Sequence, residues 1–455
     1  MLLNRENSLL KRLQQYCGNM AQLRRTVMTV MCIASFVVFY NDSHAQQKKQ
    51  LATTILADSR MDTIYAWAKN LLKKGFDAGH GYPQVWIRDL NTFIETSAEV
   101  INKTVLKERL LTFYYLQQDN GEIVDNYTAK DHFPWVNVKK YISPLDTSFA
   151  GNKNTVETDQ ETSLIQAIAK YIRITGDHAL LNEKVGSRTV YECMKHSVDF
   201  LLKHRYDNKY GLLTGATTQD WGDVQVEGGV NIDSLTHWAI DIYDNAMFVI
   251  ALNDLYSFPL SKAERKKWLF LKKKFVKNIR KHLWDAKNQK FIPHIYLNGS
   301  PFPGDFDENK MHFHGGTAVA IEAGILSRNE IKRVNDQMVK NVTLAGAQSI
   351  GLTIYPPYPD GYCKNSISVK PYVYQNGGDW TWFGGRMIQQ LISNSFVAEA
   401  CAEVQPMLDR VMKNRNFYEW YRPDGTPQGS SDFRGEAGVL AKAIKMFRAW
   451  AQENK

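Results

Sequence analysis

Helical spacing of apolar residues recurs along almost the whole chain, and this pattern constrains the fold more than any other feature. Apolar residues return at intervals of three and four in many segments, whereas the alternation typical of strands is scarce. The predicted helices are 51–74, 91–116, 161–175, 189–204, 243–256, 262–283, 316–326, 330–342, 382–394, 396–414 and 435–451. Because no proline- or serine-rich linker divides them, the sequence predicts a single all-α domain over residues 46–455.

Several connectors between these helices are long and rich in glycine, tryptophan and aspartate. The clearest are residues 75–90, 211–241 and 349–381. Long connectors are uncommon in compact domains and usually carry function. A ring of paired inner and outer helices would gather them at one rim, so we expect their aromatic and polar side chains to surround one cleft.

The first 45 residues predict an export signal that precedes the folded domain. Arg24 and Arg25 form a positive start, residues 26–40 are mainly apolar, and Ser43-His44-Ala45 resembles a cleavage site. The apolar run is shorter than the roughly 20 residues that span a bilayer. We expect cleavage after Ala45 and a periplasmic or extracellular product without stable membrane insertion. Met20 is an alternative start, and an uncleaved anchor is the alternative outcome.

The formal net charge of +9 gathers partly in residues 262–281, where Lys and Arg alternate with apolar residues at helical spacing. We interpret this segment as a solvated outer helix face and expect no nucleic-acid partner; a patch for nucleic acid or an anionic surface is the alternative.

The cysteines are few and scattered. Beyond the signal, only Cys193, Cys363 and Cys401 remain, which are too few for a disulfide framework.

The sequence contains no zinc-hydrolase motif, phosphate-binding glycine loop or nucleophile elbow, so we expect neither a metal nor an organic cofactor. His312 and His314 fit a neutral turn before a helix better than a metal pair. Calcium remains open at an acidic turn, for which simple solvation is the alternative; its residues are Asp305, Asp307 and Glu308.

The connectors concentrate the residue types that bind sugars. Aromatic rings stack on the apolar face of a pyranose, while carboxylates and guanidinium groups hold its hydroxyls. The richest segments are 83–89, 157–162, 217–223, 374–385 and 416–425. The predicted substrate-binding residues are Trp86, Arg88, Asp89, Asp159, Gln160, Trp221, Gln375, Asn376, Trp380 and Trp382. Structural roles are the alternatives: an Arg88–Asp89 ion pair, a helix cap at Asp159, and core packing of the two late tryptophans.

In these segments the chain resembles the (α/α)6-toroid glycosidases, which include glucoamylases, debranching α-1,6-glucosidases, trehalases and processing α-glucosidases of the family-63 type. The resemblance is carried by Trp86-Ile87-Arg88-Asp89, Asp220-Trp221-Gly222-Asp223, residues 374–385 and Phe417-Tyr418-Glu419-Trp420-Tyr421. It implies a six-hairpin toroid and an exo-acting, inverting hydrolase that releases a terminal sugar from an oligosaccharide, with an α-glucoside as the first choice.

The resemblance also implies a general acid near Trp221 and a general base near Trp420. Asp223 is the preferred acid and Asp220 its rival, whereas Glu419 is the preferred base and Glu436 its rival. An inverting pair holds its carboxyl groups roughly 6.5–9.5 Å apart, which leaves room for a water molecule. Two other readings stay open: a polysaccharide lyase or sugar epimerase on a helical toroid, and a glycan-binding homologue without activity.

Overall fold

The computed structural model describes residues 45–134, 139–364 and 370–455, and these fall into two compact units. The smaller unit contains residues 45–58 and 448–455. In it, the Arg448 guanidinium donates to the backbone carbonyls of Ile55 and Asp58, which lie at the end of a helix over residues 45–57. Except for Ala45, the predicted signal lies outside the described residues.

The larger unit, Ser59–Phe447, holds the rest of the helices and all the strands. Its helices are α2 (Ser59–Leu72), α3 (Ile87–Ser97), α4 (Lys103–Tyr115), α5 (Gln160–Thr175), α6 (Val190–His204), α7 (Ile242–Ser257), α8 (Lys262–His282), α9 (His314–Glu322), α10 (Arg328–Ala345), α11 (Thr381–Ser393), α12 (Val397–Glu403), α13 (Gln405–Asn414) and α14 (Arg434–Glu453), the last of which runs into the smaller unit.

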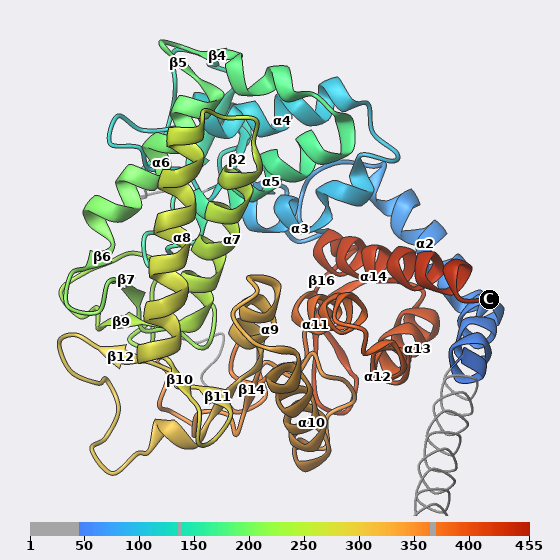
Figure 1. The fold of residues 1–455 in the computed structure, drawn as a ribbon. Coiled ribbons are helices and arrows are strands. Elements are labelled where there is room, and N and C mark those ends of the chain that lie inside the picture. The colour runs from blue at the N-terminus through green and yellow to red at the C-terminus, as the bar shows by residue number, and fades with distance from the viewer. Residues whose placement is uncertain (1–44, 135–138, 365–369) are drawn as a thin grey trace, which may run out of the picture. The chain divides into compact units, whose positions relative to one another are not determined.

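Six of these helices form a closed inner ring (Figure 1). Helix α3 packs on α5, α5 on α7, α7 on α9, and α9 on α11. Helix α14 closes the ring: the Gln389 side chain of α11 donates to the carbonyl of Val439 at 2.8 Å, and Gly438 lies directly against Phe93 of α3. A side chain at Gly438 would overlap the backbone and Cβ of Phe93, so glycine permits this close approach.

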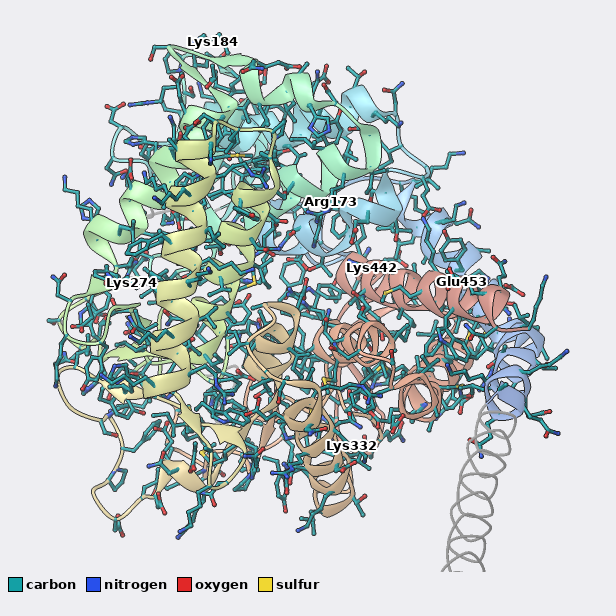
Figure 2. All side chains as sticks on the ribbon, in the orientation of Figure 1. Arg173, Lys184, Lys274, Lys332, Lys442 and Glu453 are labelled. Atoms are coloured by element: carbon teal, nitrogen blue, oxygen red, sulfur yellow. The ribbon has the colours of Figure 1, made fainter. Side chains whose placement is uncertain are left out.

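Each inner helix follows an outer one along the chain. The outer layer consists of α2, α4, α6, α8, α10 and the pair α12 and α13, and α13 packs against α2. Alternating outer and inner helices around a closed ring are the arrangement that the predicted (α/α)6 toroid requires. On α8, Trp268, Phe275 and Ile279 face the core, while most of the lysines, such as Lys274 in Figure 2, are exposed.

Short strands precede four of the inner helices. β1 (Val85–Trp86) leads into α3, β9 (Trp238–Ile240) into α7, β13 (His312–Phe313) into α9, and β16 (Pro427–Ser431) into α14. Their partners are β2 (Asn126–Ala129), β8 (Gly215–Ala216), β12 (Ile295–Tyr296), β14 (Ile354–Tyr355) and β15 (Tyr418–Tyr421), and β3 (Phe149–Asn152) extends the first sheet. The all-α prediction omitted these strands because two to five residues are too short to show alternation.

Three predicted helices are broken in the structure. The segment 91–116 was predicted as one helix, which is wrong: α3 ends at Ser97, and α4 begins after Asn102, whose side chain accepts a hydrogen bond from the backbone N–H of Thr104 at 2.8 Å. The prediction failed because apolar spacing continues across the turn. Likewise 396–414 divides into α12 and α13, with a proline in the first turn of α13, and 51–74 breaks at Asp58.

Within the described residues, none of the three cysteines of the predicted mature chain forms a disulfide, and all three are buried. Within residues 45–134, 139–364 and 370–455, no helix is both long enough and apolar enough to cross a membrane.

Candidate active site

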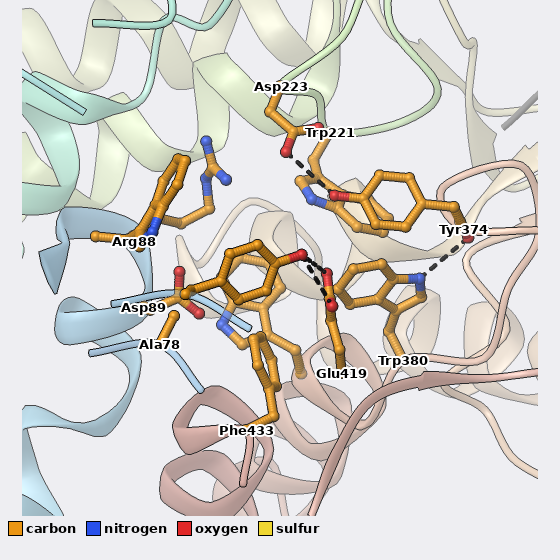
Figure 3. Close-up of a pocket in the computed structure, with 12 residues that line it drawn as sticks. Ala78, Arg88, Asp89, Trp221, Asp223, Tyr374, Trp380, Glu419 and Phe433 are labelled. Atoms are coloured by element: carbon orange, nitrogen blue, oxygen red, sulfur yellow. Dashed lines mark hydrogen bonds between the residues drawn. The ribbon is translucent and has the colours of Figure 1, made fainter. Parts of the chain in front are cut away.

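A pocket of about 510 Å³ opens at the rim where the inner helices begin (Figure 3). Most of the wall is aromatic, and every lining residue belongs to the larger unit. The lining residues are Ala78, Tyr82, Trp86, Arg88, Asp89, Trp221, Asp223, Tyr374, Trp380, Trp382, Glu419 and Phe433.

Glu419 enters the pocket from an irregular point in the β15–β16 hairpin. The pairing register shifts between Tyr418 and Trp420, so residues 429 and 430 both lie opposite Glu419. The Glu419 carboxylate accepts a hydrogen bond from the backbone N–H of Ser430 at 2.9 Å and from the Tyr82 hydroxyl at 3.0 and 3.1 Å to its two oxygens. Gly429 has φ +68°, and a Cβ there would meet a Glu419 oxygen at 2.3 Å. The hairpin therefore fixes where this carboxylate points.

Asp223 reaches the same pocket from the connector between α6 and α7. Its carboxylate accepts hydrogen bonds from the Gln375 side-chain amide at 2.6 Å and the Tyr374 hydroxyl at 3.2 Å. Figure 3 shows Asp223 and Glu419 arising from different segments and pointing into one space. Among the described residues, neither carboxylate forms an ion pair. Both are therefore held by neutral donors.

Arg88 lies in the first turn of α3, where its guanidinium is shared between the pocket and two buried acids. It pairs with Asp159 at 2.7 Å and with Glu157. The Tyr243 hydroxyl donates to the same Asp159 at 2.6 Å. These contacts hold Arg88 rigidly, with its partners behind the pocket wall.

Tryptophan rings from two connectors and from the first turn of α11 pack together to form the aromatic wall. The Trp221 ring lies 5.0 Å from that of Trp380, edge to face, and 6.4 Å from that of Trp382. The Trp380 indole N–H donates to the carbonyl of Tyr374 at 3.1 Å, and the Trp382 indole donates to Thr92. Because these polar edges are satisfied, the rings hold fixed orientations and offer their faces to a ligand.

A model of the glycosyl hydrolase 94 superfamily catalytic domain matches residues 56–386, which is most of the chain. The chain belongs to this superfamily. The match ends before Glu419, so the second pocket carboxylate lies in a part of the chain that the family model does not cover.

Solved structures support the same fold at low sequence identity. The chain is similar to a GH63 mannosylglycerate hydrolase from Thermus thermophilus, with 16% identity, a TM-score of 0.58, and coverage of 83% of this chain and 99% of that one. It is also similar to a rhamnosidase from Klebsiella oxytoca, with 13% identity, a TM-score of 0.57, and coverage of 86% of this chain and 64% of that one. No curated protein matches the sequence. At these identities the likeness shows the helical-toroid fold alone.

Several predicted residues of this superfamily member stand outside the pocket lining. Asp220, in a left-handed conformation, accepts hydrogen bonds from the backbone N–H groups of Gly315 and Gly316 at 2.6 and 2.8 Å and so caps α9. Glu436 accepts from the backbone N–H of Tyr418 at 2.6 Å and lies 3.7 Å from Arg410. Asp220 and Glu436, the alternatives to Asp223 and Glu419, therefore make structural contacts outside the pocket lining.

The other predicted binding residues act behind the wall. Asp159 holds Arg88, and Gln160 donates to Glu157 at 2.8 Å. Asn376 bonds to the backbone of Tyr358 through both ends of its amide, at 2.8 and 3.1 Å, which fixes the turn beside it. Gln375 contacts Asp223 directly, so it supports a lining carboxylate without lining the pocket itself.

Burial changes the acidity of the pocket carboxyls. Loss of solvent raises the pKa of Glu419 to about 7, against the stabilising hydrogen bonds from Ser430 and Tyr82. Burial also raises the pKa of Asp89 to about 6, opposed by the positive charge of Arg88. The pKa of Tyr82 rises because of burial and of the adjacent Glu419, so its hydroxyl remains a donor at neutral pH.

Tyr82, Tyr374, Ala78 and Phe433 line the pocket but were absent from the predicted site. Tyr82 and Tyr374 lay inside connectors already identified as functional, but a tyrosine in an aromatic loop carries no distinguishing signal. Ala78 lies in the predicted connector 75–90, but Ala78 and Phe433 contribute only apolar surface, which no motif in the sequence marks.

No cluster of three or more potential metal ligands exists within the described ranges. At the acidic turn, Glu308 bonds to His294 at 2.9 Å and to the hydroxyls of Tyr296 and Tyr358, so its oxygens are already engaged. His314 bonds to the carbonyl of Leu352 at 2.8 Å, and burial lowers its pKa to about 3. His314 is therefore uncharged at neutral pH. The predicted turn is wrong, because His312 lies in β13 and His314 is the first residue of α9.

Proposed function

We propose that this superfamily member is an exo-acting, inverting glycoside hydrolase that releases a terminal sugar, with an α-glucoside as the first substrate to test. The observation that carries the proposal is the pair Asp223 and Glu419: two carboxyls, free of ion pairs in the described structure, that share one aromatic pocket. Glycosidic hydrolysis needs one carboxyl to give a proton and another to take one.

In the proposed reaction, Asp223 donates its proton to the glycosidic oxygen as the bond from that oxygen to the anomeric carbon breaks. A water molecule forms the new bond to the anomeric carbon and gives a proton to Glu419. Proton exchange with solvent then restores both carboxyls. A base whose pKa lies near the working pH is well matched to this step, and burial raises the pKa of Glu419 to about 7.

The terminal sugar would lie between the aromatic wall and the start of α3. Arg88 and Asp89 provide a donor and an acceptor for neighbouring hydroxyls, and Trp86 and Trp382 provide ring faces. Contact with ring faces on one side and charged groups on the other suits a pyranose, which has apolar faces and a polar edge.

The test compares Asp223→Asn and Glu419→Gln on two substrate classes. Both variants should lose at least about 1,000-fold in kcat on an ordinary disaccharide, in keeping with the loss of a general acid or base. A glycosyl fluoride needs little protonation on departure, so Asp223→Asn should keep much of its activity on the fluoride, whereas Glu419→Gln should not. Anomer-resolved NMR of the first product should show inverted configuration.

Glu403 supplies a matched control. It is another glutamate whose pKa burial raises to about 7, but it lies on α12, bonded to Asn335 and outside the pocket lining. Glu403→Gln should keep near-normal kcat. If Glu419→Gln also keeps most of its kcat, the assignment of the base is wrong; intact ligand after long incubation with the unmodified protein would instead favour a glycan-binding role.

A lyase or epimerase finds less support. No histidine lines the described pocket, whereas an epimerase is expected to rely on paired histidines. We also retain the proposal that residues 1–45 direct export, which N-terminal sequencing of the mature protein from the host would test.

A further inference from the structure

A second cavity lies inside the inner ring of helices, behind the wall of the active-site pocket. It measures about 260 Å³, against about 510 Å³ for the pocket, and the described lining residues of the two do not overlap. Thr92 lines the cavity and accepts the indole N–H of Trp382, which lines the pocket. Trp382 therefore stands between the two spaces. The residues that line the second cavity are Thr92, Glu95, Lys170, Glu322, Arg386, Gln389, Val439 and Lys442, which come from α3, α5, α9, α11 and α14.

Five of these eight residues carry a charge, and four of the five form ion pairs. Arg386 pairs with Glu322 at 2.8 Å, and Lys442 pairs with Glu95 at 2.5 Å. Although burial opposes ionisation of both acids, the neighbouring cations hold the pKa of Glu322 at about 2 and the pKa of Glu95 below its ordinary value. Each acid is therefore ionised and balanced by its own partner, and the fifth charge, that of Lys170, is left over.

The Lys170 ammonium lacks the contacts that a buried charge needs. Lys170 is 7% exposed, and within the described residues its ammonium forms no ion pair and one hydrogen bond, to the carbonyl of Asn91 at 2.7 Å. Two of its three N–H donors are thus without an acceptor from the chain. Lys153, another buried lysine, instead contacts the Glu161 carboxylate at 3.0 Å and the carbonyl of Ile123 at 2.8 Å. Since burial of an unpaired charge is costly, the free donors of Lys170 indicate a site for an acceptor that the chain does not supply.

The next charged neighbours leave this balance unchanged. Arg173, on the same helix as Lys170, pairs with Asp254 of α7 at 2.7 Å. The electrostatic influence of this pair extends to Glu95 and Lys170, but its own charges cancel. The end of the cavity at Lys442 and Glu95 is also open to solvent, because their side chains are 31% and 26% exposed. A small ion can therefore enter and leave.

We propose that this cavity binds one small monovalent anion, of the size and charge of chloride, at the Lys170 ammonium. The anion would accept hydrogen bonds from the donors that Asn91 leaves free, and its single charge would match the single cation in excess. Burial lowers the pKa of Lys170 to about 8, against the opposing charge of Glu95, so the ammonium is mostly protonated at pH 7. This site is independent of the proposed hydrolase reaction, and failure of one proposal leaves the other standing.

The test measures thermal unfolding of the whole protein while sodium chloride replaces sodium gluconate at constant ionic strength. Constant ionic strength keeps screening fixed, so that binding of chloride is what changes. Because a ligand that binds the folded state stabilises it, Tm should rise by about 1–2 °C for each tenfold of chloride above its Kd. The rise should fade as the pH passes 8, because Lys170 then loses the proton that attracts the anion.

Two variants separate the site from general salt effects. Lys170→Met keeps a chain of similar length without the charge and should lose the chloride-dependent rise. Lys290→Met is the matched control and should keep it: Lys290 is also 7% exposed, and its ammonium donates to the carbonyls of Asn309 and Met311 outside this cavity. No rise in the unmodified protein, or the same rise in Lys170→Met, would overturn the proposal.

A second measurement needs no variant and so remains decisive if Lys170→Met fails to fold. Bromide resembles chloride and scatters X-rays anomalously, so crystals of the unmodified protein soaked in sodium bromide report its position directly. We expect an anomalous peak in contact with the Lys170 ammonium. A bromide-soaked crystal without a peak in this cavity would refute the site.

Discussion

Tyr82→Phe removes one hydroxyl and tests the role of Glu419 directly. The Tyr82 hydroxyl donates to the Glu419 carboxylate at 3.0 and 3.1 Å, and the pKa of Tyr82 is raised, so the donor persists across the working pH range. A hydrogen bond of this kind stabilises the ionised form of Glu419 and lowers its pKa. Its loss must therefore raise the pKa of Glu419 above the starting value of about 7.

The size of the effect follows from the energy of the bond. A hydrogen bond to a charged group contributes about 1.5–3 kcal/mol, and one pKa unit corresponds to about 1.4 kcal/mol. Water entering the space would replace part of the bond, so we expect a rise of about one unit, to roughly 8. At pH 7 the ionised fraction of Glu419 would then fall from about one half to about one tenth, and kcat/KM would drop roughly fivefold.

The assay is the pH profile of kcat/KM on a neutral aryl glycoside. If Glu419 is the base, the acidic limb of the profile should move up by about one unit, and activity should recover at higher pH. A shift of the alkaline limb instead would mean that Glu419 acts as the acid, and an unmoved profile would refute the proposed contact. Tyr65→Phe is the control, because it removes a tyrosine–glutamate hydrogen bond at Glu99, outside the pocket.

Three further predictions address the framework. Gly429→Ala forces a Cβ against Glu419 at a φ of +68°, so kcat should fall at least about tenfold, and unfolding should show about 1–2 kcal/mol of lost stability; an unchanged kcat would contradict this geometry. Asp220→Ala leaves two buried N–H groups of α9 unpaired and should cost about 2–3 kcal/mol in denaturant unfolding, yet a folded variant should keep its kcat if Asp220 is only a cap. Burial opposes ionisation of Glu322, but Arg386 and nearby lysines lower its pKa to about 2. Ionised Glu322 should therefore add roughly 3 kcal/mol to the free energy of unfolding above pH 4.5, and this contribution should be lost between pH 4.5 and pH 2. Glu322→Gln should flatten the curve of unfolding free energy against pH in that range.

The sequence predicted the helical architecture well where local spacing decides it. Helices α5, α6, α7 and α8 begin within one residue of their predicted starts, because their apolar faces are local signals; in α6, α7 and α8 a side-chain cap adds a second one. The break between α3 and α4 was missed because the apolar spacing runs through the turn. A tertiary demand, the reversal from inner to outer layer, determines that break.

For the site, the sequence located the connectors but could not assign each acid. Asp220 and Asp223 are three residues apart in one motif. Their difference depends on a pair of glycine N–H groups 95 and 96 residues away from Asp220. Similarly, Glu436 pairs with Arg410 and accepts a hydrogen bond from the backbone of Tyr418. Glu419, by contrast, lies in the pocket because the pairing register shifts beside it in the hairpin. Such long-range contacts leave no trace in local spacing.

Closure of the inner ring by α14 against α3 has a consequence for how the protein matures. The pocket combines groups from the first inner helix, Arg88 and Asp89, with groups supplied just before the last one, Glu419 and Phe433. A ribosome must therefore pass residue 433 before the two halves of the site can meet. A chain that stops before Tyr418 lacks the hairpin, so it should have no activity rather than reduced activity.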